Sequence, residues 1–184
     1  MSEPDEQTLS TLVKRGDRTA MRQMYSRYIG HLTAVCSRYI ADDDDVKDVL
    51  QDSFIKIFAS AGEFVYRGKG SLKAWLTKIV VNEALNHIKD RKRIILAPLD
   101  NETETSIEED TPPDIDKIPP EVIHDMIRRL PEGYRTVFNL YVIDGQPHKE
   151  IARILGISEN TSASQLHRAK ATLANEINKY ISKH

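Results

Sequence analysis

The middle of the chain contains a segment that cannot belong to a hydrophobic core, and this segment divides the sequence into two parts. Between Ala97 and Pro120, prolines stand among acidic residues, and the few apolar side chains cannot offset the entropy of ordering the backbone. The prolines are Pro98, Pro112, Pro113, Pro119 and Pro120. We therefore expect two small domains, at residues 1–95 and 120–184, joined by an acidic, proline-containing linker at residues 96–119.

Outside this linker, apolar residues recur at the three- and four-residue spacing of amphipathic helices, and no run alternates with a period of two. The pattern predicts an all-α chain made of two small helical domains. In the first domain the expected helices cover residues 6–14, 19–40, 46–59 and 71–93, with a break at residues 41–45. In the second domain they cover residues 121–130, 131–143, 147–155 and 159–180.

The formal net charge of the chain is -2, but charges of opposite sign are segregated along the sequence. Residues 67–93 hold eight basic and two acidic side chains, whereas residues 100–116 hold eight acidic and no basic side chains. The acidic linker therefore cancels the charge of a cationic surface only in the total. A partner made of phosphate, such as a nucleic acid, is compatible with this distribution.

The composition disfavours several classes of protein. No stretch approaches the roughly 18 uninterrupted apolar residues of a membrane span, and residues 1–10 are polar and acidic, unlike a secretion signal. Cys36 is the single cysteine and the six histidines are scattered, so neither a disulfide framework nor a zinc site is indicated. No combination of nucleophile, base and acid stands out, nor does a phosphate-binding loop. We expect a cytoplasmic protein without membrane insertion, metal or cofactor, and not an enzyme.

The second domain contains the sequence of a tight helical corner at residues 149–158, KEIARILGIS. The apolar residues Ile151, Ala152 and Leu155 share one face of its first helix. Gly156 suits the positive φ of the turn, and Ser158 suits the N-cap of the helix that follows. The spacing predicts a helix-turn-helix.

The helix after this corner has a polar face near its start. Its buried stripe is expected to contain Leu166, Ala169, Leu173 and Ile177. The exposed side chains are expected to be Asn160, Ser164, Gln165, His167 and Arg168. Hydrogen-bonding side chains on the first turns of such a helix are typical of proteins that read the major groove of DNA. For this pattern taken alone, a helical hairpin with an ordinary solvated face is the alternative.

The residues around the corner extend this pattern. Residues 130–140, LPEGYRTVFNL, and the turn Asp144-Gly145 precede it, and residues 166–170, LHRAK, follow it. This ordered string resembles the C-terminal promoter-binding domain of bacterial sigma factors. The resemblance implies that one set of side chains faces the -35 promoter element: Ser164, Gln165, His167 and Arg168. It implies that Lys149, Ser158 and Thr161 contact phosphates.

Two positions depart from the family pattern. Relatives often carry basic residues where this chain has Ala163 and Gln165. We therefore expect a weaker attraction to phosphate, and a preference for adenine over guanine if Gln165 reads a base edge.

One expected helix of the first domain has an acidic face. Its inward stripe is expected to be Val46, Val49, Leu50, Phe54, Ile57 and Phe58. This leaves Asp48, Gln51, Asp52 and Ile55 on another face. An ordinary solvated face is the alternative. Residues 48–58, DVLQDSFIKIF, closely resemble the sigma segment that docks on the coiled-coil of the largest polymerase subunit. The resemblance implies that Asp48, Gln51, Asp52 and Ile55 bind core RNA polymerase.

The helix expected at residues 71–93 has a polar stripe that suits a DNA strand, and a loop rich in glycine precedes it. The stripe contains Lys78, Asn82, Asn86, Lys89 and Arg93, at intervals of four, four, three and four residues. The loop combines aromatic rings with cations, which suits capture of an unstacked base. Tyr66 is the better candidate for that capture, whereas Phe64 is the candidate for an anchor of the loop and Trp75 for a core residue.

Residues 70–86, GSLKAWLTKIVVNEALN, resemble the sigma region that opens the -10 promoter element. The resemblance implies a DNA-binding set for this element: Tyr66, Arg67, Lys69, Lys78, Asn82, Asn86 and Lys89. Together, the matches in this order resemble a sigma-70 family sigma factor of the extracytoplasmic-function (ECF) type.

This resemblance implies a function and three partners. The chain would bind core RNA polymerase and promoter DNA, direct promoter-specific transcription initiation, and be restrained by an anti-sigma factor. Two alternatives remain at this point. A stand-alone helix-turn-helix regulator would dimerise and bind DNA without polymerase. A sequestering interaction protein would bind polymerase without directing transcription.

Overall fold

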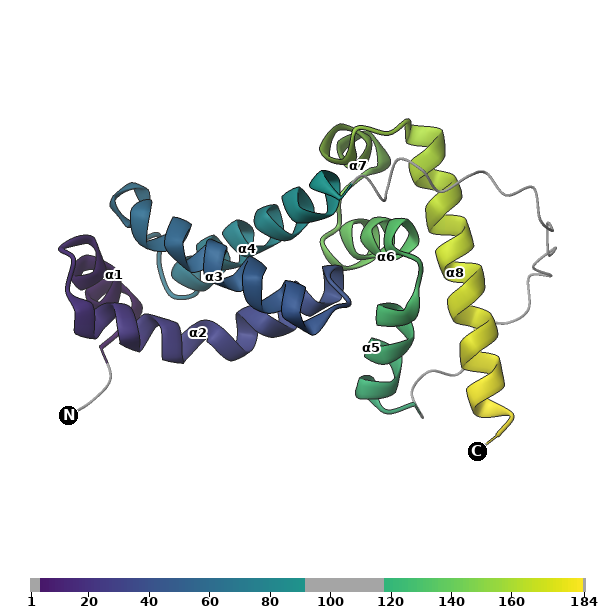
Figure 1. Ribbon diagram of the computed structural model, residues 1–184, viewed down its shortest axis with the longest axis horizontal. Coiled ribbons are helices and arrows are strands. Elements are labelled where there is room, and N and C mark those ends of the chain that lie inside the picture. The colour runs from purple at the N-terminus through teal and green to yellow at the C-terminus, as the bar shows by residue number, and fades with distance from the viewer. Residues whose placement is uncertain (1–3, 92–117, 184) are drawn as a thin grey trace. The chain divides into compact units, whose positions relative to one another are not determined.

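The structure, a computed structural model, describes residues 4–91 and 118–183 (Figure 1). The chain divides into two compact units, Met1–His87 and Ile88–His184. Within the described residues all regular secondary structure is helical, as the periodicity predicts. Residues 96–117 of the expected linker, together with Arg93, lie outside the described residues. The domain bounds given above stay a prediction.

The first unit contains α1 (Glu6–Lys14), α2 (Arg18–Tyr39), α3 (Asp43–Ala59), the short 3₁₀ turn η1 (Ala61–Glu63) and most of α4 (Ser71–Asp90). Helix α2 packs against both α1 and α3, and α1 also packs against η1. The side chains of Asp5 and Asp17 cap α1 and α2 by accepting hydrogen bonds from amides of the first turn.

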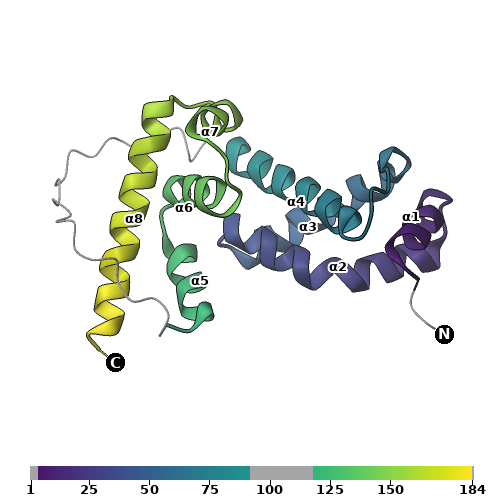
Figure 2. The same cartoon turned by 180° about the vertical axis from the view of Figure 1, so that it is seen from behind.

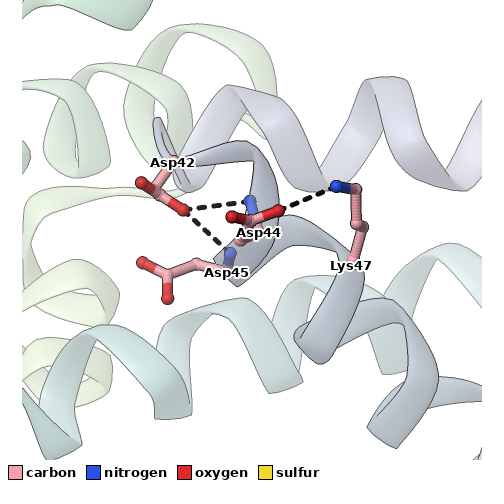
Figure 3. A network of polar contacts seen from close by, with 4 residues as sticks. All are labelled: Asp42, Asp44, Asp45 and Lys47. Atoms are coloured by element: carbon pink, nitrogen blue, oxygen red, sulfur yellow. Dashed lines mark hydrogen bonds and ion pairs between the residues drawn. The ribbon is translucent and has the colours of Figure 1, made fainter.

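Helix α3 begins earlier than the sequence predicts. We expected a break at residues 41–45, but Asp42 is an N-cap: its carboxylate accepts hydrogen bonds from the amides of Asp44 at 2.9 Å and Asp45 at 3.0 Å (Figure 3). Asp44 also pairs with Lys47 at 2.8 Å. Negative side chains are favoured at a helix N-terminus, because the peptide dipoles place partial positive charge there. The run of aspartates is therefore a cap and a first turn.

The core of the first unit is formed by one apolar stripe from each helix. Its completely buried large side chains include Met24, Leu32, Tyr39, Ile57, Leu72 and Leu76. The stripe expected in α3 is confirmed, since Val46, Val49, Leu50, Phe54 and Ile57 are buried and Phe58 is half-buried. Two polar pairs join α3 to α4: Lys56 to Glu83 at 2.6 Å, and Asp45 to His87 at 3.7 Å.

The second unit contains α5 (Pro120–Arg129), α6 (Glu132–Phe138), the π-helical turn η3 (Asn139–Ile143), α7 (His148–Leu155) and α8 (Glu159–Ile181). Within this unit α8 packs against α5, α6 and α7 (Figure 2). Met126 and Leu130 meet Ala169 and Leu173 in its core. The helix expected at residues 131–143 is thus α6 continued by η3, where Asn139 donates to the carbonyl oxygen of Arg135 at 2.9 Å.

Candidate functional site

The outer face of α3 presents acids around an apolar side chain. Asp48, Gln51, Asp52 and Ile55 are all exposed. Ile55 is 61% exposed, although neighbouring Phe54 and Ile57 are buried. An exposed isoleucine does not obtain the favourable free energy that burial of its side chain would give. This position therefore suits contact with another macromolecule. The structure therefore brings the predicted docking residues together on one surface.

A tyrosine adds to the apolar surface of α2 beside α3, and the sequence reasoning missed it. Tyr25 is 47% exposed. Its ring centroid lies 4.7 Å from that of Phe54, the residue before Ile55. The available signal was its place next to Met24, one step away from the buried stripe of α2.

The predicted polar stripe of α4 is accessible along the described part of the helix. Lys78, Asn82, Asn86 and Lys89 are all exposed. The opposite side of the helix is held in the core by Leu72, Leu76, Val80 and Ile88. Because these side chains recur every three or four residues, their donors line one side of a straight element and suit the spaced acceptors of a nucleic-acid strand.

The loop between η1 and α4 is folded back by a serine. Ser71 donates through its hydroxyl to the carbonyl oxygen of Gly68 at 2.7 Å and accepts from the amide of Arg67 at 3.2 Å. Gly68 and Gly70 have φ angles of 112° and 89°, which side chains with a Cβ rarely adopt. The loop therefore has a defined backbone path.

The aromatic residues of this loop have different roles. Phe64 is 4% exposed and lies against Trp75 with ring centroids 5.3 Å apart. Phe64 is thus the anchor of the loop. Trp75, which was expected to be a core residue, is only half-buried and packs against the Phe64 ring. Tyr66 is half-buried, while Arg67 and Lys69 are exposed, so the accessible ring and cations of the loop lie between the anchor and α4.

The helix-turn-helix of the second unit forms as expected. Gly156 takes the left-handed conformation at φ 68° and ends α7. Ser158 caps α8 by accepting the amide of Thr161 at 3.0 Å. The predicted phosphate contacts Lys149, Ser158 and Thr161 are all exposed. Helix α8 thus starts with accessible donors.

Three of the four predicted base-reading side chains of α8 are accessible. Ser164 and His167 are exposed, and Arg168 is half-buried. The guanidinium of Arg168 lies 3.4 Å from the hydroxyl of Tyr134 in α6, which limits its range of conformations. Asn160 is exposed as well.

Gln165 is not exposed, contrary to the prediction. Its side chain is buried, with 7% of its surface accessible, and packs against α6. A Cβ on Gly133 would lie only 3.1 Å from Gln165 Oε1, so the glycine makes room for the amide. Gln165 stands three residues after buried Ser162 and four before Ala169, which places it on the buried face. That spacing was the signal that the sequence reasoning passed over.

A histidine joins α7 to α8, and it too was missed. A ring nitrogen of His148, the first residue of α7, lies 2.9 Å from the hydroxyl of Ser162 in α8. Its ring also stacks on Tyr141 with centroids 4.6 Å apart. These contacts fix the start of α7 against α8.

Within residues 4–91 and 118–183, no group of His, Cys, Asp or Glu is arranged to hold a metal ion. In the same residues, no helix is long and apolar enough to cross a bilayer.

Family models match both units of the chain. The model described as Sigma-70 region 2 matches residues 24–94. The model described as Sigma-70, region 4 matches residues 121–173. The two matches stand in the order of the two helical units.

Curated proteins are similar along nearly the whole length. The ECF RNA polymerase sigma-E factor of Haemophilus influenzae is 29% identical over 182 residues, covering 94% of this chain and 95% of the relative. The sigma-E factor of Escherichia coli is 28% identical over 186 residues, with 96% of each chain covered. The RNA polymerase sigma-H factor of Pseudomonas aeruginosa is 26% identical, with 94% of each covered.

Solved structures also resemble the chain. The structure of CnrH in complex with the cytosolic domain of CnrY matches with a TM-score of 0.46 and 23% identity, covering 93% of this chain and 96% of the other. The sigma factor RpoE of Bartonella quintana, in complex with the anti-sigma factor NepR, matches with a TM-score of 0.47 and 23% identity, covering 86% and 96%.

Proposed function

Because this chain belongs to the sigma-70 family, as an ECF sigma factor that directs transcription initiation, we propose that the exposed surfaces of α3, α4 and α8 bind RNA polymerase and the two promoter elements. The protein is a non-enzymatic transcription factor. A stand-alone helix-turn-helix regulator, the alternative considered above, would leave the region 2 match at residues 24–94 without a role.

The exposed face of α3 is the proposed docking surface for core polymerase. The observation that supports it is Ile55, 61% exposed among Asp48, Gln51 and Asp52. Acids around an apolar centre suit a basic partner surface that has an apolar patch, because charge complementarity guides the encounter while apolar burial supplies affinity.

Charge reversal in α3 tests this surface. We expect Asp52→Lys to weaken binding to core polymerase by at least roughly tenfold, measured by competition against a labelled sigma factor. Glu63→Lys, at an exposed acid in η1, makes the same charge change beyond the surface and is the control. Equal affinity of the Asp52 variant and the control would remove this assignment.

The loop and the α4 stripe are the proposed -10 surface. Tyr66, Arg67 and Lys69 would hold an unstacked base, and the stripe would follow the strand that carries it: Lys78, Asn82, Asn86 and Lys89. We expect Tyr66→Ala to slow promoter opening, while Tyr66→Phe retains most activity because stacking needs the ring and not the hydroxyl. Permanganate footprinting of the opened bases measures this. If the alanine variant opened promoters at the normal rate, Tyr66 would have no role in capture.

The start of α8 is the proposed -35 surface. Ser164, His167 and Arg168 would reach base edges, and the exposed residues Lys149, Ser158 and Thr161 would contact phosphates. Gln165 is left out because it is buried. We expect Arg168→Ala to spare core binding and to reduce promoter use. Tyr134→Phe, which removes only the hydroxyl 3.4 Å from Arg168, separates a base contact from a contact within the protein.

Promoter choice would come from two weak contacts made together. With polymerase holding both units, binding of one promoter element raises the effective concentration of the other. Such a protein would act in the cytoplasm, where the polymerase is. Transcription in vitro from a genomic library, with purified core enzyme, would identify the promoters, and the absence of any promoter-dependent product would refute the proposal.

An anti-sigma factor is the remaining proposed partner. A protein inhibitor that covers the exposed face of α3 would compete directly with polymerase. We expect a co-purifying inhibitor to be displaced by core enzyme, and to bind the Asp52→Lys variant less well. Simultaneous binding of inhibitor and core enzyme would exclude this mode of inhibition.

A further inference from the structure

Helix α1 contacts both ends of the loop that joins η1 to α4. Lys14, the last residue of α1, donates a hydrogen bond through Nζ to the carbonyl oxygen of Phe64, where the loop begins. Its ammonium group also lies 5.9 Å from the centre of the Phe64 ring, within the range of a cation-π interaction. The same side chain therefore holds the backbone and the ring of the anchor residue.

The first residue of α1 holds the other end of this loop. Glu6 Oε2 accepts the amide of Gly70 at 2.7 Å, immediately before α4 begins. Its second oxygen, Oε1, accepts the hydroxyl of Tyr28 in α2 at 3.1 Å, which fixes the orientation of the carboxylate. A carboxylate in this place also benefits from the partial positive charge at the start of α4.

Helix α1 is itself firmly attached to the unit. Asp5 caps it, and Leu9 and Val13 are 1% and 2% exposed. Glu6 and Lys14 are two helical turns apart, a separation of about 12 Å at 1.5 Å per residue. Glu6 and Lys14 thus attach the two ends of the loop to one rigid helix. The exposed part of the loop between these attachment points contains Val65, Arg67 and Lys69. The region 2 match starts at residue 24, so α1 lies outside it.

We propose that Glu6 and Lys14 are positioning residues for promoter opening, which hold both ends of the 64–70 loop so that Tyr66 meets an unstacked base in one preset conformation. This inference rests on the -10 role of the loop proposed above. A loop that is ordered before it binds loses less conformational entropy on binding. The change in net charge cannot explain the expected defect of a Glu6→Ala variant. Loss of the negative charge of Glu6 would by itself favour DNA binding, whereas loss of loop positioning would oppose it.

The first measurement needs no DNA. Trp75 is the single tryptophan of the chain and lies against Phe64, so its emission and its quenching by acrylamide report the anchor. We expect Glu6→Ala and Lys14→Met to raise hydrogen exchange of residues 64–70 by roughly tenfold, the loss expected for one hydrogen bond to a charged group. Lys14→Met should also change the quenching of Trp75. Lys14→Arg, which keeps a donor and a cation, should restore both signals.

The matched controls change the same charges nearby. Arg15→Met removes an exposed cation next to Lys14, and Glu63→Gln removes an exposed acid near the loop. Neither should alter exchange in the loop. Exchange in Glu6→Ala and Lys14→Met equal to that of these controls would overturn the proposal.

The second measurement tests, in the complete holoenzyme, whether the effect of Glu6 on promoter opening depends on the captured base. On a promoter mapped by transcription from a genomic library, we expect Glu6→Ala to slow opening roughly tenfold. Where the captured base is replaced by an abasic site, the same substitution should have little further effect, since there is nothing left to capture. A general loss of folding would lower both rates alike, and equal defects on the two templates would overturn the positioning role.

Failure of the underlying loop function has a different signature. In that case Tyr66→Ala would leave opening unchanged even though Glu6→Ala and Lys14→Met increase exchange in the loop. That combination would show that Glu6 and Lys14 have no role in promoter opening and make only structural contacts with the loop.

Discussion

A buried arginine in the second unit allows a prediction of stability from the structure. Arg135 in α6 is 5% exposed, and its guanidinium donates to the carbonyl oxygens of Arg128 at 2.8 Å and Leu130 at 3.1 Å. These carbonyls lie where α5 ends, so they have no acceptor role within a continuing helix. Burial lowers the pKa of Arg135, whereas the charge of Glu132 acts in the opposite direction. Arg135 therefore supplies hydrogen-bond donors to carbonyl oxygens at the C-terminal end of α5.

We expect Arg135→Met, which keeps most of the volume, to reduce the free energy of unfolding of the second unit by about 3 kcal/mol. A hydrogen bond to a charged group contributes about 1.5 to 3 kcal/mol, and two bonds from one group are not additive. A small unit has a total stability of only about 5 kcal/mol. The slowest-exchanging amides of α6 and α8 should then exchange roughly 100-fold faster.

Hydrogen exchange followed by mass spectrometry measures this effect in the full chain. Arg129→Met removes an exposed arginine six residues earlier, at the last residue of α5, and is the matched control. Arg135→Lys should increase the exchange rate by an amount between those of Arg135→Met and the control, because an ammonium group cannot reproduce the planar fork of the guanidinium. A change of less than about threefold in the Arg135→Met protein would refute the reasoning, since it would mean that water replaces the lost bonds at little cost.

Three further predictions follow from buried groups. Burial, and then the charge of Glu6, raise the pKa of Tyr28 to about 12. The unfolded chain therefore loses this proton first, and stability should fall by on the order of 2 kcal/mol as the pH rises from about 10 to 12, an effect that Tyr28→Phe abolishes in urea titrations. Burial also raises the pKa of the Cys36 thiol to about 12, so alkylation by iodoacetamide should be slow until urea unfolds the chain, and equal rates in both states would contradict the burial. Gln165 Oε1 is buried and finds no hydrogen-bond partner among the described residues, so Gln165→Leu should raise unfolding stability by about 1 kcal/mol and leave promoter preference unchanged; a changed -35 preference in transcription assays would instead support base reading.

Local sequence signals predicted most of the helices, because caps and periodicity act over a few residues. Residues 6–14 were expected as a helix and form α1 with those bounds. Gly156 and Ser158 mark the turn of the helix-turn-helix, where the backbone itself requires a positive φ and a capping oxygen. The exposed acids of α3 follow in the same way from the spacing of its buried residues.

The errors arose where one residue type suits two structures. The aspartates at residues 42–45 have the composition of a loop, yet hydrogen bonds from Asp42 make them a helix start. Gln165 is polar and was expected in water, but it stands at the edge of the buried stripe opposite Gly133. Polarity predicts the side of a helix only when no neighbouring element offers a fitting space.

The sequence by itself determined that the chain forms helices in two modules, and it determined most of the side chains that the helices present outward, with Gln165 as an exception. Only the tertiary structure decided which residues distant in the chain meet: Glu6 with Gly70, Lys14 with Phe64, and His148 with Ser162. The physical reason is range. Helix periodicity and capping depend on neighbours within about four residues, whereas the path of a loop depends on whichever side chains the packing of other helices brings to it.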